Sequence, residues 1–129
     1  MKLTELKPWL HRYVESNEGH PGIKPEGGEF GDPYPHVTLP RADNVEDAQG
    51  MMFLCPACFT KNGGPKGTHR IMVTFVDRGV PDNYGSHARD GSPSRWVVTG
   101  TGFDNLTLSP SVDVGCWHGF VQNGDVLTV

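Results

Sequence analysis

The three cysteines of this chain fall in two short motifs that together could bind a metal ion. Cys55 and Cys58 are separated by two residues, a spacing at which two thiolates reach one ion when the backbone turns tightly between them. Cys116 and His118 stand two residues apart in a predicted strand, where side chains at this spacing point to the same side. The four residues would form a Cys3His set, a known class of structural zinc site. The sequence therefore predicts one tetrahedral Zn²⁺ ion between the two motifs.

His69 is a fifth candidate ligand. It opens a predicted strand shortly after the loop that leaves the first motif. It could replace Cys116 or His118 as a ligand, or form a hydrogen bond with a ligand. The gap between Cys58 and Cys116 is far longer than in a minimal zinc finger, so the ion would join two distant parts of the chain.

Two alternatives to a metal site are open from the sequence. A redox pair of the thioredoxin type also has the Cys-x-x-Cys spacing, but a helix normally follows its second cysteine. Here residues 59–65 read Phe-Thr-Lys-Asn-Gly-Gly-Pro, which predicts a turn and disfavours a redox pair. The other alternative is a set of free thiols. The first residues lack the apolar core of a signal peptide, so we expect a cytoplasmic protein with reduced cysteines.

The number of protein ligands separates a structural from a catalytic zinc ion. Four ligands leave no open position, whereas three leave room for a water molecule and allow hydrolysis. A catalytic ion also needs a nearby carboxylate as general base. Asp113 and Asp125 flank the predicted C-terminal hairpin, yet no histidine belongs to an HExxH or HxE pattern. We therefore expect structural zinc and no catalytic residue, with a zinc-dependent hydrolase as the alternative.

The elements that position these residues are mainly strands. From residue 36 onward, short segments rich in β-branched and aromatic residues alternate with turn residues. The clearest local signal is Asn123-Gly124, which supplies the two positive-φ residues of a type I′ turn and predicts a C-terminal hairpin. The pattern is typical of a mostly β protein, a small β-sandwich or open barrel. The predicted strands are 36–39, 51–54, 69–77, 95–99, 105–108, 112–114, 117–122 and 125–129.

The front of the chain has a different pattern. Residues 3–15 carry apolar residues at spacings of three and four, which predicts a short helix, and Pro8 places its start near residue 7. The glycines and prolines of residues 16–35 predict a long loop, and residues 81–94 predict a second one. We expect a single domain over 1–129, with the helix and a Gly/Pro-rich arm in 1–49 and a zinc-binding β core in 50–129.

Composition and charge limit the possible functions. Hydrophobic residues make up 36% of the chain, which predicts a thin core of the kind that often needs a metal ion or a partner. The net charge of −4 comes from the first 50 residues, and the remainder is neutral. Nucleic-acid binding therefore lacks its main driving force, a strongly basic face. No run of about 18 apolar residues exists, so we expect no membrane span.

In combination, several motifs resemble a family of small uncharacterised proteins encoded by tailed bacteriophages and prophages. The resemblance covers most of residues 50–129 and touches the start of the chain. Its members often have Cys-Gly-Trp-His where this chain has Gly115-Cys116-Trp117-His118, which favours His118 and His69 over Cys116 as ligands. The motifs that carry the resemblance lie at residues 3–6, 52–59, 67–69, 79–82, 95–96, 99–102, 106–111 and 116–124.

The resemblance implies a zinc-ribbon-like β-protein of phage origin. We expect a non-enzymatic accessory or virion-associated protein that acts through contact with a phage or host protein. Its location would be the host bacterial cytoplasm or the virion, and an oligomer is compatible with the sequence.

Overall fold

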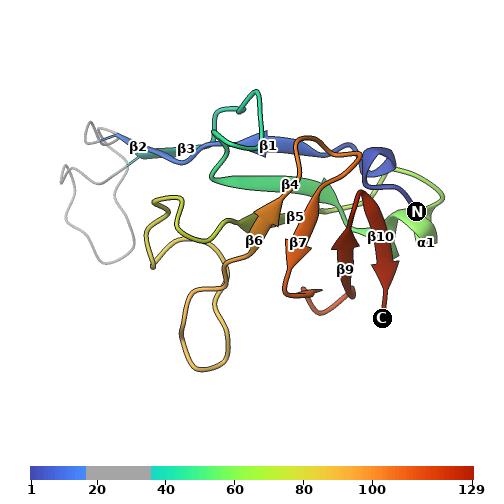
Figure 1. Ribbon diagram of the computed structural model, residues 1–129. Helices are drawn as coiled ribbons and strands as arrows, with labels where there is room; N and C mark the ends of the chain where they lie inside the picture. Colours follow the sequence, from blue (N-terminus) through green and yellow to red (C-terminus); the bar gives the residue numbers. More distant parts are fainter. Residues whose placement is uncertain (17–35) are drawn as a thin grey trace.

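A computed structural model describes residues 1–16 and 36–129 of the chain (Figure 1). Short antiparallel strands dominate, and they are divided among several small sheets. The prediction of a mostly β fold is therefore confirmed. The predicted loop over 16–35, with His20, falls almost entirely outside the described residues.

The largest contribution to the core comes from a three-stranded antiparallel sheet with the order β1-β4-β5. Its strands are β1 (Trp9–His11), β4 (Gly50–Leu54) and β5 (Arg70–Thr74). Alternate side chains of a strand point to opposite faces, so one face of this sheet carries Met51, Phe53, Ile71 and Val73 into the core. β5 is shorter than the predicted strand 69–77, which ends in a turn where Asp77 has a φ of 56°.

A second three-stranded sheet, with the order β10-β9-β8, contains the C-terminal hairpin. Its strands are β8 (Val112–Asp113), β9 (His118–Gln122) and β10 (Asp125–Thr128). Asn123 and Gly124 connect β9 to β10 with φ values of 50° and 79°. Both residues are in the left-handed region that a type I′ turn requires, so the hairpin prediction is confirmed.

Two further strand pairs complete the sheets. β2 (Val14–Ser16) pairs with β3 (His36–Thr38), and β6 (Val97–Thr99) pairs with β7 (Thr107–Ser109). Both pairs are antiparallel. The predicted loop over 81–94 contains no named strand or helix and carries one isolated bridge, between His87 and Pro93.

The helix predicted to start near residue 7 does not form. A short 3₁₀ helix, η1 (Leu3–Leu6), ends at Lys7, whose backbone is left-handed with φ 49° and ψ 53°. The chain then enters β1, which pairs with β4. The apolar spacing has another cause: Leu3, Leu6 and Leu10 enter the core from two different elements. Pairing with β4 thus overrides the helical pattern.

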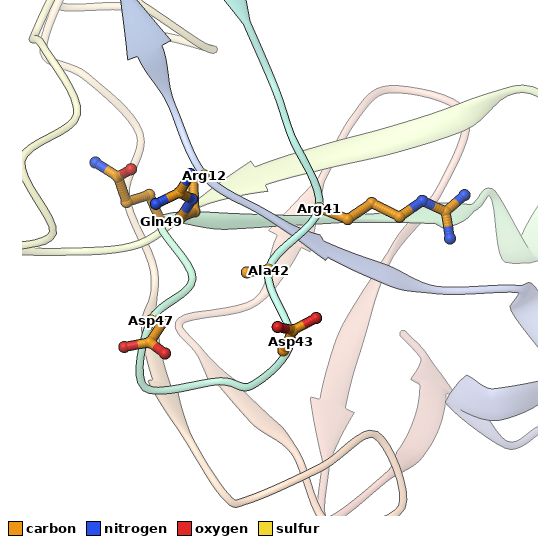
Figure 2. Close-up of a pocket in the computed structure, with 6 residues that line it drawn as sticks. All are labelled: Arg12, Arg41, Ala42, Asp43, Asp47 and Gln49. Atoms are coloured by element: carbon orange, nitrogen blue, oxygen red, sulfur yellow. The ribbon is translucent and has the colours of Figure 1, made fainter.

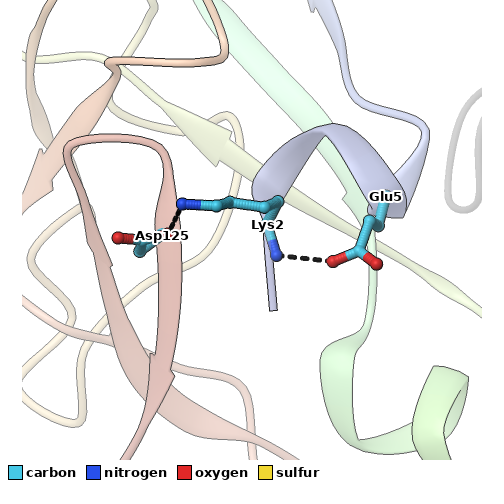
Figure 3. Close-up of polar contacts among 3 residues, drawn as sticks. All are labelled: Lys2, Glu5 and Asp125. Atoms are coloured by element: carbon cyan, nitrogen blue, oxygen red, sulfur yellow. Dashed lines mark hydrogen bonds and ion pairs between the residues drawn. The ribbon is translucent and has the colours of Figure 1, made fainter.

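The start of the chain is bound to the C-terminal hairpin. The backbone N–H of Leu3 donates to the carbonyl of Gly124 at 2.9 Å, and that of Val126 donates to the carbonyl of Met1 at 2.8 Å. The ammonium group of Lys2 pairs with the carboxylate of Asp125 (Figure 3). Consequently η1, the hairpin and helix α1 (Pro56–Asn62) gather at one end of the molecule (Figure 1).

Candidate metal centre

Four of the five candidate ligands lie together at the end of the molecule that holds η1, α1 and the C-terminal hairpin (Figure 1). One ligand atom each from Cys55, Cys58, His69 and Cys116 forms a group in which all atoms are within 4.8 Å of one another. Three separate parts of the chain contribute: the β4–α1 junction, the residue before β5, and the bend between β8 and β9. The cluster is a possible metal site at the molecular surface, because Cys55 is buried whereas His69 and Cys116 are exposed.

The first two cysteines are positioned by the start of α1. Cys55 is the residue that precedes the helix, and Pro56 takes the first helical position, where its fixed φ and missing N–H cost nothing. The N–H of Phe59 donates to the carbonyl of Cys55 at 2.8 Å, so Cys58 lies within the first helical turn. The helix ends at Gly63, whose φ is 72°.

This helix corrects the sequence prediction of a turn over 59–65. The Gly-Gly-Pro at 63–65 does stop the helix, but seven residues form before it. A helix this short covers less than two full turns of side chains, too few for a periodic apolar pattern to stand out. Because a helix does continue past Cys58, the sequence argument against a redox pair no longer holds. Other observations must decide between thiol chemistry and metal binding.

His69 is positioned by the pairing of β4 with β5. The N–H of Cys55 donates to the carbonyl of His69 at 2.9 Å, which extends the ladder by one pair and places the two residues side by side. The Nε2 atom of His69 is 3.1 Å from the sulfur of Cys116, and its Nδ1 atom is 3.3 Å from the carbonyl oxygen of Arg70. When Nδ1–H donates to this carbonyl, the lone pair of Nε2 faces the sulfurs, as in a metal-binding imidazole.

Cys116 is held by the anchoring of its neighbour. Trp117 is buried, lies edge-on to Phe53 with ring centroids 6.3 Å apart, and donates its indole N–H to the hydroxyl of Thr128 at 2.9 Å. The bend is closed by the N–H of Val114, which donates to the carbonyl of Trp117 at 3.0 Å. The sulfur of Cys116 is thereby placed 3.5 Å from that of Cys55.

His118 lies outside the cluster. It is the first residue of β9, whereas Cys116 precedes the strand on the bend, so the predicted same-side geometry of the two residues does not occur. The ring of His118 is exposed, and its Nε2 atom is 3.1 Å from the hydroxyl of Ser111. The bend thus brings Cys116, and not His118, into the cluster, although the resemblance favoured His118.

Two of the three thiols in the cluster, those of Cys58 and Cys116, resist ionisation. The hydrogen bond with Cys55 and desolvation raise the pKa of Cys116 to about 11. The same two causes raise the pKa of Cys58. A cation that binds here must displace the protons of these thiols, because thiolates and not thiols are metal ligands.

No carboxylate belongs to the cluster among the described residues. The two aspartates that flank the hairpin have other partners: Asp113 accepts from the N–H of Gly115 at 3.2 Å, and Asp125 pairs with Lys2. The sulfur-rich donor set suits a borderline-soft ion such as Zn²⁺ and lacks the general base that metal-dependent hydrolysis needs.

Comparison of the chain with protein-family models, with curated proteins and with solved structures gives no match. Within residues 1–16 and 36–129, no helix has both the length and the apolar character needed to cross a membrane.

Proposed function

We propose that Cys55, Cys58, His69 and Cys116 bind one Zn²⁺ ion, which acts as a structural cross-link. The observation that carries the proposal is the convergence of four donors from three chain segments. With Zn–S distances of about 2.3 Å and Zn–N distances of about 2.0–2.1 Å, tetrahedral angles separate neighbouring ligand atoms by roughly 3.5–3.8 Å. The separations of 3.5 Å between Cys55 and Cys116 and 3.1 Å between His69 and Cys116 are close to this range.

The donor set favours a structural over a catalytic ion. Four protein donors complete a tetrahedral shell, so no position is left for a water molecule or a substrate. The absence of a carboxylate from the cluster, within the part of the chain that the structure describes, removes the general base as well. Both features support a structural ion over the hydrolase alternative.

The biological part of the proposal is a non-enzymatic role through contact with another protein. The resemblance of several motifs to small tailed-phage proteins supports a phage accessory or virion-associated protein, located in the host bacterial cytoplasm or in the virion. A structural zinc centre fits such a role, since the ion maintains a binding surface and takes no part in chemistry.

Elemental analysis of untagged protein, purified under reducing conditions without chelators, tests the metal. We expect about one zinc per chain, consistent with a single four-ligand site. The matched variants are Cys58→Ser, which should lose the ion, and His118→Ala, which should retain it. Protein that contains no metal, or a brown protein with iron and labile sulfide, would overturn the proposal.

A further inference from the structure

The face of the β1-β4-β5 sheet that points away from the core carries a row of three large side chains. The strand register aligns Trp9 with Met52 and Met52 with Met72 across the three strands. All three are half-buried, in contrast to the fully buried residues of the opposite face. We use the name Trp9 face for this row together with Arg41 and Arg70.

Two arginines lie over the indole ring. The guanidinium carbon of Arg41 is 4.7 Å and that of Arg70 is 3.9 Å from the ring centroid of Trp9. These distances are typical of cation–π contacts. Both arginines are exposed, so they present positive charge at the surface beside the apolar row.

Arg41 is directed to this face by the backbone. Arg41 forms an isolated antiparallel β-bridge with His11, which places Arg41 beside β1. Asp43 and Asp47 line the same pocket as Arg41, but Figure 2 shows the Arg41 side chain extending away from both carboxylates. The nearest acidic residues of its own loop therefore leave its guanidinium available.

The positive charge of the Trp9 face is not neutralised within the described residues. The only ion pair found there joins Lys2 to Asp125, so neither arginine of the face has a carboxylate partner in that part of the chain. Arg70 also lies within a segment, residues 51–76, that contains no acidic residue, although the chain as a whole has a net charge of −4. The face is thus a basic area on an acidic protein.

We propose that the Trp9 face binds an acidic segment of a protein partner. Carboxylates of the partner would pair with Arg41 and Arg70, and a neighbouring apolar side chain would pack on Met52 and Met72. Guanidinium–carboxylate pairs are among the strong charge-assisted hydrogen bonds, and methionine adapts its shape to an incoming side chain. The inference rests on the proposed role in protein contact and names the surface and the chemistry of the partner.

The arrangement favours a protein over a nucleic acid. Single-stranded nucleic acids bind by stacking bases on exposed aromatic rings along a basic groove. Here the indole of Trp9 is already contacted by two guanidinium groups, and the neighbouring positions are thioethers instead of further aromatic rings. Such a row offers apolar contact and two directed ionic positions, which is a pattern for a peptide.

A display library of random linear peptides, panned on the folded full-length protein, tests the proposal. Panning on the double variant Arg41→Gln/Arg70→Gln in parallel removes peptides that bind elsewhere. We expect selected sequences with acidic residues around one apolar residue, and a loss of affinity on the order of tenfold or more in the double variant. Selected peptide should also shift the indole N–H resonance of Trp9, assigned with Trp9→Phe.

The matched control is Lys66→Gln/Arg89→Gln, which removes the same charge from exposed positions outside the Trp9 face. Equal weakening in both double variants, or selected peptides without acidic residues, would overturn the proposal. Oligo(dT) that binds more tightly than the peptides and depends on Arg41 and Arg70 would assign the face to nucleic acid instead. Zinc content and circular dichroism, measured for every variant, keep a failed metal site or a folding defect apart from a failed surface.

Discussion

The ring of His69 has a different neighbour at each of its nitrogen atoms. Nε2 faces the sulfur of Cys116, and Nδ1 faces the carbonyl of Arg70, so the ring is oriented from both sides. The ring of His118 has the hydroxyl of Ser111 as its single hydrogen-bond neighbour in the described part of the chain, at its Nε2 atom. Residue type alone therefore does not decide which histidine can serve as a ligand; the neighbours of its two ring nitrogens do.

This difference predicts unequal effects for the two histidines. His69→Ala should lower zinc affinity by more than the roughly 10- to 100-fold that loss of an outer hydrogen-bond partner costs, because a direct ligand is removed. His118→Ala should leave the affinity unchanged. Competition with a chromophoric chelator measures both. A larger loss for His118→Ala than for His69→Ala would contradict the assignment of ligands.

His11 is a second histidine with a defined environment. It is 1% exposed, and neither of its ring nitrogens has a hydrogen-bond partner among residues 1–16 and 36–129. Burial lowers the pKa of His11 below its ordinary value of 6.5. Well above pH 6.5 the ring is neutral in both the folded and the unfolded chain, and no penalty arises. As the pH falls below 6.5, the unfolded chain takes up the proton first, so the free energy of unfolding decreases until the pKa of the folded state is reached.

Replacing His11 with leucine tests this pH dependence. In His11→Leu the acid-induced loss of stability below pH 6.5 should be smaller than in the wild type, and the stability near pH 8 should be similar or higher, since an unpaired polar ring is replaced by an apolar side chain. Urea denaturation of both proteins between pH 8 and pH 5 measures the effect. The other groups that titrate in this range are common to both proteins, so the difference between the two curves of stability against pH isolates His11. Parallel curves for the two proteins would refute the role of His11.

Strands are the elements that local sequence specified best. The β-branched and aromatic runs led to most of the observed strands, and Asn123-Gly124 led to the hairpin, because turn chemistry acts within a few residues. The prediction of a helix near residue 7 was wrong for a non-local reason. Nothing near Lys7 indicates that its backbone turns left-handed, since that conformation is imposed by the pairing of β1 with β4.

The close pairing of β1 with β4 also explains why β4 begins with glycine. A Cβ atom on Gly50 would lie 2.7 Å from the carbonyl oxygen of Val73 and 2.8 Å from Nε2 of His11. Because the oxygen belongs to the backbone of β5, the sheet itself would have to shift.

Gly50→Ala should therefore destabilise the protein by about 1–3 kcal/mol, the usual cost of overpacking. Chemical denaturation at pH 8, where His11 is neutral, measures the change. Gly63→Ala is an instructive comparison, because nothing lies within 4 Å of a Cβ atom there and the cost arises only from the φ of 72°. An unchanged stability of Gly50→Ala would show that the two strands can separate without cost.

On the scale of the whole molecule, the cluster joins parts of the chain that otherwise belong to different sheets. Cys55, Cys58 and His69 are attached to the β1-β4-β5 sheet, and Cys116 is attached to the β8–β9 bend of the other three-stranded sheet. The sequence identified all four as candidates from residue type and motif. It could not exclude His118, because the choice depends on where β9 begins, and a strand boundary is uncertain by more than the one residue that matters here.

The proposed position of a Zn²⁺ ion between the two sheets predicts that its removal unfolds the protein. Binding of structural zinc contributes about 10–16 kcal/mol in finger peptides, whereas whole domains are stable by only about 5–15 kcal/mol. The free energy of zinc binding is thus as large as the stability of a whole domain, so the metal-free chain should lose its fold instead of loosening locally. Treatment with a strong chelator under reducing conditions should abolish the cooperative thermal transition, and equimolar Zn²⁺ should restore it. Hydrogen exchange gives the decisive contrast: protection should vanish in β4 and β5 as well as near residues 112–118, whereas a loss confined to the bend would mean that the sheets stay folded without the ion.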